Sequence, residues 1–353
     1  EGPVVIHVIT EKGRGYSPAE DDDEKHLHDA PVFNPVTGPP KSVPTGYTQA
    51  FANGIMALAE KDPRVVAITA AMLGPTGLDA FADKFPDRTF DVGIAEQHAV
   101  TSAVGMAHAG LHPVIAIYAT FLNRAIDQVI MDAALHQAGV TFALDRSGVT
   151  GDDGASHNGM WDMALLRVVP GLDLFAPRDG ARLVSALRNC VDKSDHPTVI
   201  RFSKGAIPND IPAVQSLGFA DVLQAATNPD VTIVSVGGMA TQALEAAATL
   251  QSHGYAVEVI DPVQVLPVAS GLIEYLANRE FVVTIEDGLV DGGIGEAIGS
   301  ALRAAKATTR VISLGIPKKF LDHATRKSIL TKLQLDAQGI AETIEQGLKT
   351  TVR

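Results

Sequence analysis

Short apolar runs alternate with stretches of helical apolar spacing along most of this sequence. Runs typical of strands occupy residues 65–69, 90–94, 114–118 and 141–144, and helical patterns occupy residues 50–61, 96–109 and 126–137. Two parallel strands need a crossover between them, usually a helix, whereas antiparallel strands need only a tight turn. The alternation therefore predicts an α/β domain built on a doubly wound parallel sheet.

A second block of the same kind follows a proline-rich stretch at residues 204–218. Strand-like runs at 231–236, 256–260, 281–285 and 310–313 alternate there with helical patterns at 241–253 and 294–305. The 353 residues suit two domains of ordinary size. We expect a first domain over residues 44–210 and a smaller α/β domain over residues 218–353. Residues 1–43 would contain one strand at 4–9 and a linker rich in glycine, proline and acids.

Charge and cysteine content exclude several classes of protein. The 28 basic and 41 acidic residues give a net charge of −13, so no general field attracts nucleic acid or an anionic membrane surface. One cysteine, Cys190, cannot form an internal disulfide, which favours a reducing compartment such as the cytoplasm. The sequence has no run of about 18 apolar residues that would predict a membrane span, and its first residues lack the basic region of a secretory signal. Because an apolar run begins soon after Glu1, we expect the sequence to start inside a domain.

Three weaker patterns favour structural roles. GGIGEAIG follows a strand-like run and opens a helix, but Gly293, Gly295 and Gly299 lack the spacing of a dinucleotide-binding turn, which favours close helix packing. The 11 histidines show no metal-ligand spacing, so we predict no metal site formed by this chain alone. Cys190 lies in a helical stretch without a nearby histidine, which favours a structural thiol over a nucleophile.

Polar and aromatic side chains follow three successive strands of the first domain. An isolated glutamate in the first turn of a helix is most simply a charge that the helix dipole favours. Open α/β sheets, however, bind ligands at the carboxyl ends of their strands, and several such side chains gathered there predict a binding site. Strand by strand, they are Glu96; Tyr118, Phe121 and Arg124; and Arg146, Asp153 and His157.

These segments resemble a known family. FDVGIAEQHAV, IYATFLNRAIDQV and DRSGVTGDDGASHNG are similar to signature segments of the 1-deoxy-D-xylulose-5-phosphate synthase family, thiamine-diphosphate enzymes of the transketolase superfamily. The resemblance extends to KGRGYSPAE and HLHDAPVF near the start and to VEVIDPVQVLP and SLGIPKKF near the end. It implies a pyrimidine-binding domain, a transketolase C-terminal-like domain and a homodimer. The implied reaction condenses pyruvate with glyceraldehyde 3-phosphate to 1-deoxy-D-xylulose 5-phosphate, with loss of carbon dioxide.

The resemblance also implies roles at the cofactor and the reacting carbons. Glu96 matches the glutamate that hydrogen-bonds the aminopyrimidine ring of thiamine diphosphate. Phe121 matches the aromatic that stacks on that ring, with a plain core phenylalanine as the alternative, and Ile94 is implied as a further cofactor contact. The polar groups implied near the reacting carbons are Asp153, His157 and the linker histidine His28, and imidazoles there suit proton transfer.

Substrate binding is implied for four more residues. Tyr118 and Arg124 match residues that line the substrate side, and Arg146 and Lys204 match residues that bind phosphate. The commoner family form at position 204 is arginine, so Lys204 keeps the charge but loses the bidentate fork. Arg201 in the same segment is a candidate to compensate, and a solvated surface role for Lys204 is the alternative.

The superfamily holds magnesium through a G-D-G motif, and the nearest string here, GDDG at 151–154, already belongs to the substrate segment. We therefore expect residues 1–43 to hold only the last strand of the diphosphate-binding domain and the linker. The magnesium ligands and the rest of that domain would lie in an N-terminal portion outside this sequence, which could be a separate chain. Transketolase and the β-chain of 2-oxoacid dehydrogenases share the architecture and remain alternatives. A non-catalytic assembly module is the alternative from another class.

Overall fold

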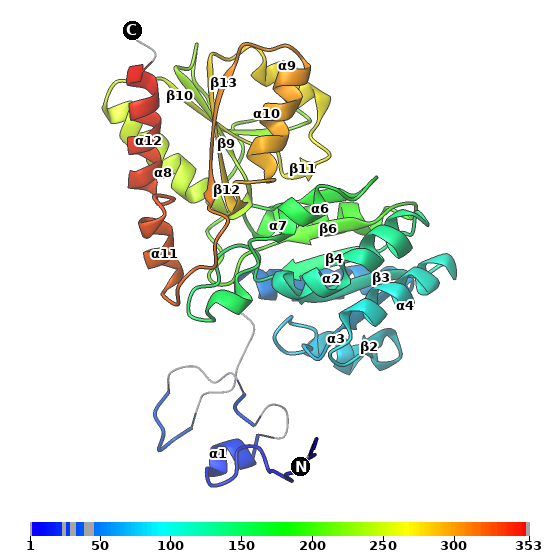
Figure 1. The fold of residues 1–353 in the computed structure, drawn as a ribbon. Coiled ribbons are helices and arrows are strands. Elements are labelled where there is room, and N and C mark those ends of the chain that lie inside the picture. Colours follow the sequence, from blue (N-terminus) through cyan, green and yellow to red (C-terminus); the bar gives the residue numbers. More distant parts are fainter. Residues whose placement is uncertain (1, 23–25, 29–32, 39–45, 351–353) are drawn as a thin grey trace. The chain divides into compact units, whose positions relative to one another are not determined.

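The computed structural model describes residues 2–22, 26–28, 33–38 and 46–350. The chain forms two compact units, which divide between Pro44 and Thr45 (Figure 1). In the first unit the one helix among the described residues is α1 (Ser17–Glu20). The strand predicted at 4–9 is wrong: these residues form no strand, and their apolar side chains are exposed. A strand needs a neighbour for its N–H and C=O groups, and no described segment pairs with this one.

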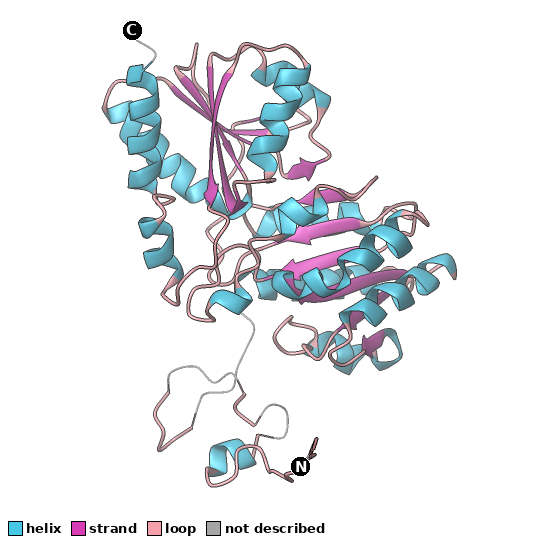
Figure 2. Ribbon diagram, viewed as in Figure 1, coloured by secondary structure: helices cyan, strands magenta, loops and turns pink. Residues whose placement is uncertain are grey.

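The second unit contains two sheets (Figure 2). The first has the strand order β11-β5-β6-β4-β3-β1-β2, and all of its strand pairs are parallel except β11 with β5. Its central strands are buried on both faces, as expected for continuous apolar runs in a parallel sheet. The strands are β1 (Val65–Thr69), β2 (Thr89–Asp91), β3 (His112–Tyr118), β4 (Thr141–Asp145), β5 (Asp173–Phe175), β6 (Thr198–Arg201) and β11 (Gln264–Leu266).

Helices cover both faces of the first sheet. On one face, α2 and α7 pack together and enclose an apolar core that includes Phe51, Ile55 and Leu187. On the other face, α4 and the irregular helical segment after β3 enclose a second core. The helical segments are α2 (Gly46–Ala59), α3 (Asp79–Lys84), η1 (Pro86–Arg88), α4 (Glu96–His108), η2 (Ala119–Ala125), α5 (Ile126–Gln128), the π-helical η3 (Val129–Ala134), η4 (Ala155–His157), α6 (Asp162–Leu166) and α7 (Gly180–Val191).

The second sheet has the order β13-β12-β9-β10-β8-β7, with parallel pairs from β13 to β10 and antiparallel pairs beyond. Helices α8 and α12 lie on one side of it and α9 and α10 on the other (Figure 1). The strands are β7 (Gln215–Ser216), β8 (Asp221–Gln224), β9 (Val231–Ser235), β10 (Val257–Asp261), β12 (Phe281–Leu289) and β13 (Arg310–Ile316). The helices are η5 (Gly237–Met239), α8 (Ala240–Ser252), α9 (Ser270–Leu276), α10 (Ile294–Ala304), α11 (Arg326–Lys332) and α12 (Ala337–Thr350).

The two sheets are joined more closely than the sequence indicates. Strand β11 follows β10 of the second sheet along the chain, yet it pairs with β5 at the edge of the first sheet. The apolar core on the α4 face of the first sheet continues into side chains of β9, β10 and α10. The predicted fold class, a doubly wound α/β domain followed by a smaller α/β domain, is confirmed.

Two predicted elements differ in detail. The strand predicted at 90–94 ends at Asp91, because Asp91 Oδ1 accepts hydrogen bonds from the backbone of Ala71 and Gly93 and turns the chain there. The helix predicted at 126–137 is α-helical only over Ile126–Gln128 and continues as π-helix. Among the described residues, no helix has the length and apolar character needed to cross a membrane.

Candidate functional site

Glu96 is the first residue of α4, directly after the turn that follows β2. Its side chain is 3% exposed, and Arg124 Nε lies 3.5 Å from Glu96 Oε2. Within the described part of the chain, that buried oxygen has no hydrogen-bond partner. The helix dipole favours a carboxylate at this position, but a buried acceptor without a donor costs free energy. Glu96 Oε2 therefore faces Arg124 in an ion pair but can still accept a hydrogen bond from a ligand.

A row of aromatic and cationic side chains lies after β3 and β4. The rings of Tyr118 and Phe121 stack with centroids 5.6 Å apart and an interplanar angle of 12°. His157 meets Phe121 edge-on, with centroids 5.7 Å apart, and the Arg146 guanidinium lies 4.3 Å from the centre of the Tyr118 ring. The structure thus brings together four side chains that the sequence assigned to successive strand ends.

Arg146 is held by its surroundings. Its backbone φ of 59° is unusual for a residue with a side chain. Arg146 Nη1 donates to Pro75 O over 2.7 Å and lies 2.9 Å from Asp145 Oδ2. Burial raises the pKa of Asp145, which also accepts a hydrogen bond from Thr48 Oγ1. Sequence reasoning missed Asp145 and Thr48, although Asp145 is the last residue of a strand, where functional side chains gather.

Lys204 is paired with another predicted site residue. Its Nζ lies 2.5 Å from Asp153 Oδ1, and both side chains remain partly exposed. Arg201, proposed above as a second phosphate ligand, is buried and binds Asp162 Oδ2 at 2.7 Å and the carbonyl oxygen of Asp287 at 2.8 Å. The hypothesis that Arg201 compensates at the phosphate is wrong, because its guanidinium is already used inside the protein.

For two further predicted residues, the structure describes exposure or contacts only within their own segment. Ile94 precedes Glu96 and is 73% exposed. His28 belongs to the N-terminal unit, where its Nδ1 lies 2.9 Å from Lys12 Nζ. The roles predicted for Ile94 and His28 stay predictions.

The glycine-rich segment at the start of α10 packs closely, as the sequence indicated. A Cβ atom on Gly295 would lie 2.3 Å from Thr284 Oγ1, and one on Gly293 would lie 2.2 Å from Leu289 O. Glu286 Oε2 and Oε1 accept hydrogen bonds from the backbone N–H groups of Ile294 and Gly295. The protein's own carboxylate therefore binds the helix terminus that a phosphate would need.

Cys190 is buried on α7, and burial raises the pKa of its thiol. A thiol that stays protonated and out of contact with solvent is a poor nucleophile. The predicted structural role is confirmed.

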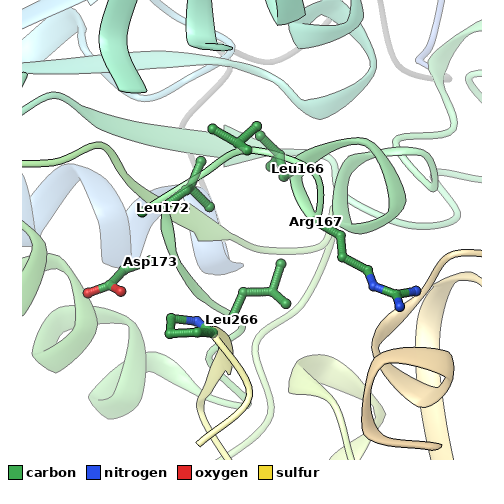
Figure 3. Close-up of a pocket in the computed structure, with 8 residues that line it drawn as sticks. Leu166, Arg167, Leu172, Asp173 and Leu266 are labelled. Carbon is green, nitrogen blue, oxygen red and sulfur yellow. The ribbon is translucent and has the colours of Figure 1, made fainter. Parts of the chain in front are cut away.

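A small pocket of about 170 Å³ lies between the end of α6, β5 and β11. Figure 3 shows Leu166, Leu172 and Leu266 around it, with Arg167 and Asp173 on opposite sides. None of the predicted site residues lines it. The described residues also contain no group of three or more histidine, cysteine or acidic side chains that could hold a metal ion.

Two family models match this chain. The model described as "Transketolase, pyrimidine binding domain" matches residues 44–210, and "Transketolase, C-terminal domain" matches residues 220–340. A 1-deoxy-D-xylulose-5-phosphate synthase from Clavibacter sepedonicus is 54% identical over 345 residues, which are 97% of this chain and 53% of the relative. The synthase 1 of Kitasatospora griseola is 51% identical over 343 residues, 96% of this chain and 53% of the relative. The chain belongs to the 1-deoxy-D-xylulose-5-phosphate synthase family.

The chain spans about half the length of these curated synthases. Among solved structures, a split-gene transketolase described as an inactive beta4 tetramer matches with a TM-score of 0.77 and 28% identity, over 87% of this chain and 99% of that one. A transketolase from Leishmania mexicana matches with a TM-score of 0.74 and 18% identity, over 88% of this chain and 47% of that one, and shows the shared fold. The resemblance to the synthase family seen in the sequence is confirmed.

Proposed function

We propose that this chain forms the pyrimidine-binding and acceptor-binding part of a thiamine-diphosphate enzyme that condenses pyruvate with glyceraldehyde 3-phosphate. The products are 1-deoxy-D-xylulose 5-phosphate and carbon dioxide. The observation that carries the proposal is that Glu96 Oε2 is buried and makes no hydrogen bond with any described residue, although Arg124 lies beside it. The names of the curated relatives support the same reaction.

The residues of the site fit the cofactor's pyrimidine. Glu96 Oε2 would accept a hydrogen bond from a protonated ring nitrogen, since it is buried and makes no hydrogen bond among the described residues. Phe121 offers a flat apolar face, and Ile94 offers an exposed apolar side chain. When bound, the cofactor supplies a nucleophilic carbon and an electron sink for decarboxylation.

The remaining side chains would bind and orient the substrates. Arg124, which is about half exposed beside Glu96, suits the carboxylate of pyruvate. Lys204 suits the phosphate of the aldehyde, and an entering phosphate would compete with Asp153 for its ammonium group. Asp153 and His157 would then hold or move protons at the hydroxyl and carbonyl oxygens of the reacting carbons.

We infer that a diphosphate-binding polypeptide completes the site and supplies the magnesium ligands. The split-gene transketolase has a chain of similar fold whose beta4 tetramer is described as inactive, which supports this division of labour. A homodimer of the completed enzyme and a cytoplasmic location belong to the same proposal.

The test is an assay of carbon dioxide release from pyruvate and glyceraldehyde 3-phosphate, with thiamine diphosphate and magnesium. The chain is measured alone and mixed with the diphosphate-binding half of a close relative. We expect release only in the mixture, with a product of the mass of 1-deoxy-D-xylulose 5-phosphate. In a parallel assay that offers a ketose phosphate as donor in place of pyruvate, a sugar formed by two-carbon transfer to glyceraldehyde 3-phosphate would indicate a transketolase instead. No reaction in a mixture that forms a stable complex would contradict the proposal.

A further inference from the structure

The segment 150–159 carries Asp153 and His157, and both of its ends are attached to the C-terminal domain. Before it, Val149 N donates to Asp287 Oδ1 over 3.0 Å. After it, Met160 O accepts from Leu289 N over 3.0 Å. The side chains of Val149 and Met160 are fully buried in the apolar cluster formed by the second sheet with α8 and α12. The first domain thus places this segment against β12 of the second.

Arg326, at the start of α11, contacts both partners of the first attachment, Val149 and Asp287. Arg326 Nη1 donates to Val149 O over 2.6 Å, and its Nη2 lies 2.5 Å from Asp287 Oδ2. Val149, Asp287 and Arg326 therefore form a closed ring of hydrogen bonds and one ion pair. Asp287 is 1% exposed, so its charge is compensated mainly by the guanidinium and the backbone N–H that face it.

Two glycines show how tightly the chain runs against this ring. Gly148 has a φ of 74°, and a Cβ atom there would lie 2.1 Å from Asp287 Oδ2. Gly151 has a φ of 81°, and a Cβ atom there would lie 2.6 Å from Arg326 N. Positive φ and contacts this short leave no room for a side chain at either position.

Within the segment, hydrogen bonds join its two ends to each other and attach its tip to the segment after β3. Asn158 Oδ1 accepts from Thr150 N over 2.9 Å and from Thr150 Oγ1 over 3.2 Å. Thr120 Oγ1, beside Phe121, donates to Ser156 O over 3.0 Å. The placement of His157 against Phe121 thus depends on a loop whose ends the C-terminal domain fixes.

We propose that Asp287 and Arg326 are positioning residues for the catalytic site: they set where Asp153 and His157 lie in the first domain. The roles of Asp153 and His157 rest on the proposed function, whereas the restraint of their segment does not. Neither Asp287 nor Arg326 contacts Asp153 or His157 among the interactions described, so they act through the backbone of 148–158.

Hydrogen exchange in the 353-residue chain tests the restraint without any assay of activity. Arg326→Gln removes the ion pair and weakens the hydrogen bond to Val149 O, so amides of 148–158 should exchange at least about tenfold faster, while β9 and β10 keep their protection. Lys332→Gln is the matched control, because Lys332, at the other end of α11, pairs with Asp322 and both side chains are exposed. Unchanged exchange in 148–158, or equal acceleration throughout the chain, would overturn the restraint.

Kinetics of the completed enzyme test the positioning role. Arg326→Gln should lower kcat at least about tenfold, Arg326→Lys should recover part of it, and Lys332→Gln should leave it unchanged. Asp287→Asn, which keeps an acceptor for Val149 N, should lower kcat as well and serves if Arg326→Gln folds poorly. If exchange quickens while kcat is unchanged, the contact is merely structural and the positioning role is wrong. If the unaltered enzyme shows no synthase activity, the proposed function fails while the exchange result still stands.

Discussion

Glu96 combines two properties that a structural glutamate does not need. Its side chain is almost completely buried, and within the described chain one of its oxygens makes no hydrogen bond. A first-turn carboxylate that served only the helix dipole would gain more by remaining hydrated or by capping backbone N–H groups. The burial of an unsatisfied oxygen is the kind of cost that proteins tolerate at functional sites.

Glu96→Gln replaces this carboxylate by a neutral amide of similar size. Because the amide cannot hold the proton of a ring nitrogen as a carboxylate does, we expect kcat of the completed enzyme to fall by at least about 100-fold. Steady-state assays at saturating thiamine diphosphate measure the effect. Glu342→Gln, at an exposed position on α12, is the control and should retain full activity. A Glu96→Gln enzyme within about twofold of the unaltered rate would contradict the role of Glu96.

Lys204 offers a test of substrate specificity at a single side chain. A charge-assisted hydrogen bond to phosphate is worth about 1.5–3 kcal/mol, so Lys204→Ala should raise KM for glyceraldehyde 3-phosphate about 10-fold to 100-fold. KM for unphosphorylated glyceraldehyde should change little. Lys204→Arg should keep the affinity for phosphate, and Lys193→Ala, at an exposed position, should change neither KM. Equal losses for both aldehydes would show that Lys204 acts through Asp153 rather than on the phosphate.

The start of α10 is an element whose stability should depend on pH. Glu286 is fully buried beneath the helix terminus, and this burial raises its pKa from the ordinary value of 4.5 to about 7 despite two backbone donors. A carboxyl whose pKa is raised on folding binds more protons in the folded state, so its contribution to stability is complete below about pH 4.5 and is lost as pH rises through about 7.

Glu286→Gln should remove this dependence. We expect the unaltered chain to lose on the order of 1–3 kcal/mol of unfolding free energy, relative to the variant, between pH 5 and pH 8. Urea unfolding at both pH values measures the difference, and Glu342→Gln should show the same pH dependence as the unaltered chain. A parallel loss of stability in the unaltered chain and in Glu286→Gln would mean that Glu286 does not titrate in this range.

Elements differ in how far the sequence predicts them. The strands at 65–69 and 141–145 are buried on both faces, and their apolar runs predict them well. The run at 4–9 has the same composition but no partner strand among the described residues, so composition alone misleads there. Strand β11 has three residues and pairs with a strand about 90 residues earlier, which no local pattern reveals. The contacts of Asp287 and Arg326 with Val149 span 138 and 177 residues, so the sequence predicts the strand-end cluster but not what restrains it.

At the scale of the whole molecule, buried charges join the two sheets. Arg178, which follows β5, is 1% exposed. Its Nη1 lies 2.8 Å from Asp221 Oδ2 in β8 and 2.8 Å from Asp261 Oδ2 in β10, and its Nη2 donates to Ile211 O. Burial raises the pKa of Asp261 to about 6 even beside the guanidinium. One arginine of the first domain thus compensates two carboxylates of the second.

Arg178→Met keeps an unbranched apolar stem but removes the guanidinium, so Asp221 and Asp261 face each other with Arg182 as the one cation paired with Asp221 among the described residues. Removing one partner of a buried ion pair costs about 3–5 kcal/mol, and the cost falls on the junction between the sheets. We therefore expect calorimetry to show a lower melting temperature and separate transitions for the two domains. Adding Asp221→Asn and Asp261→Asn should restore part of the lost stability, because the uncompensated charges are gone.

The control is Arg64→Met, which breaks an exposed pair with Asp62 and should cost no more than about 1 kcal/mol of unfolding free energy. A cost equally small for Arg178→Met would show that the apolar core shared by the sheets, rather than this ion cluster, holds the two domains together.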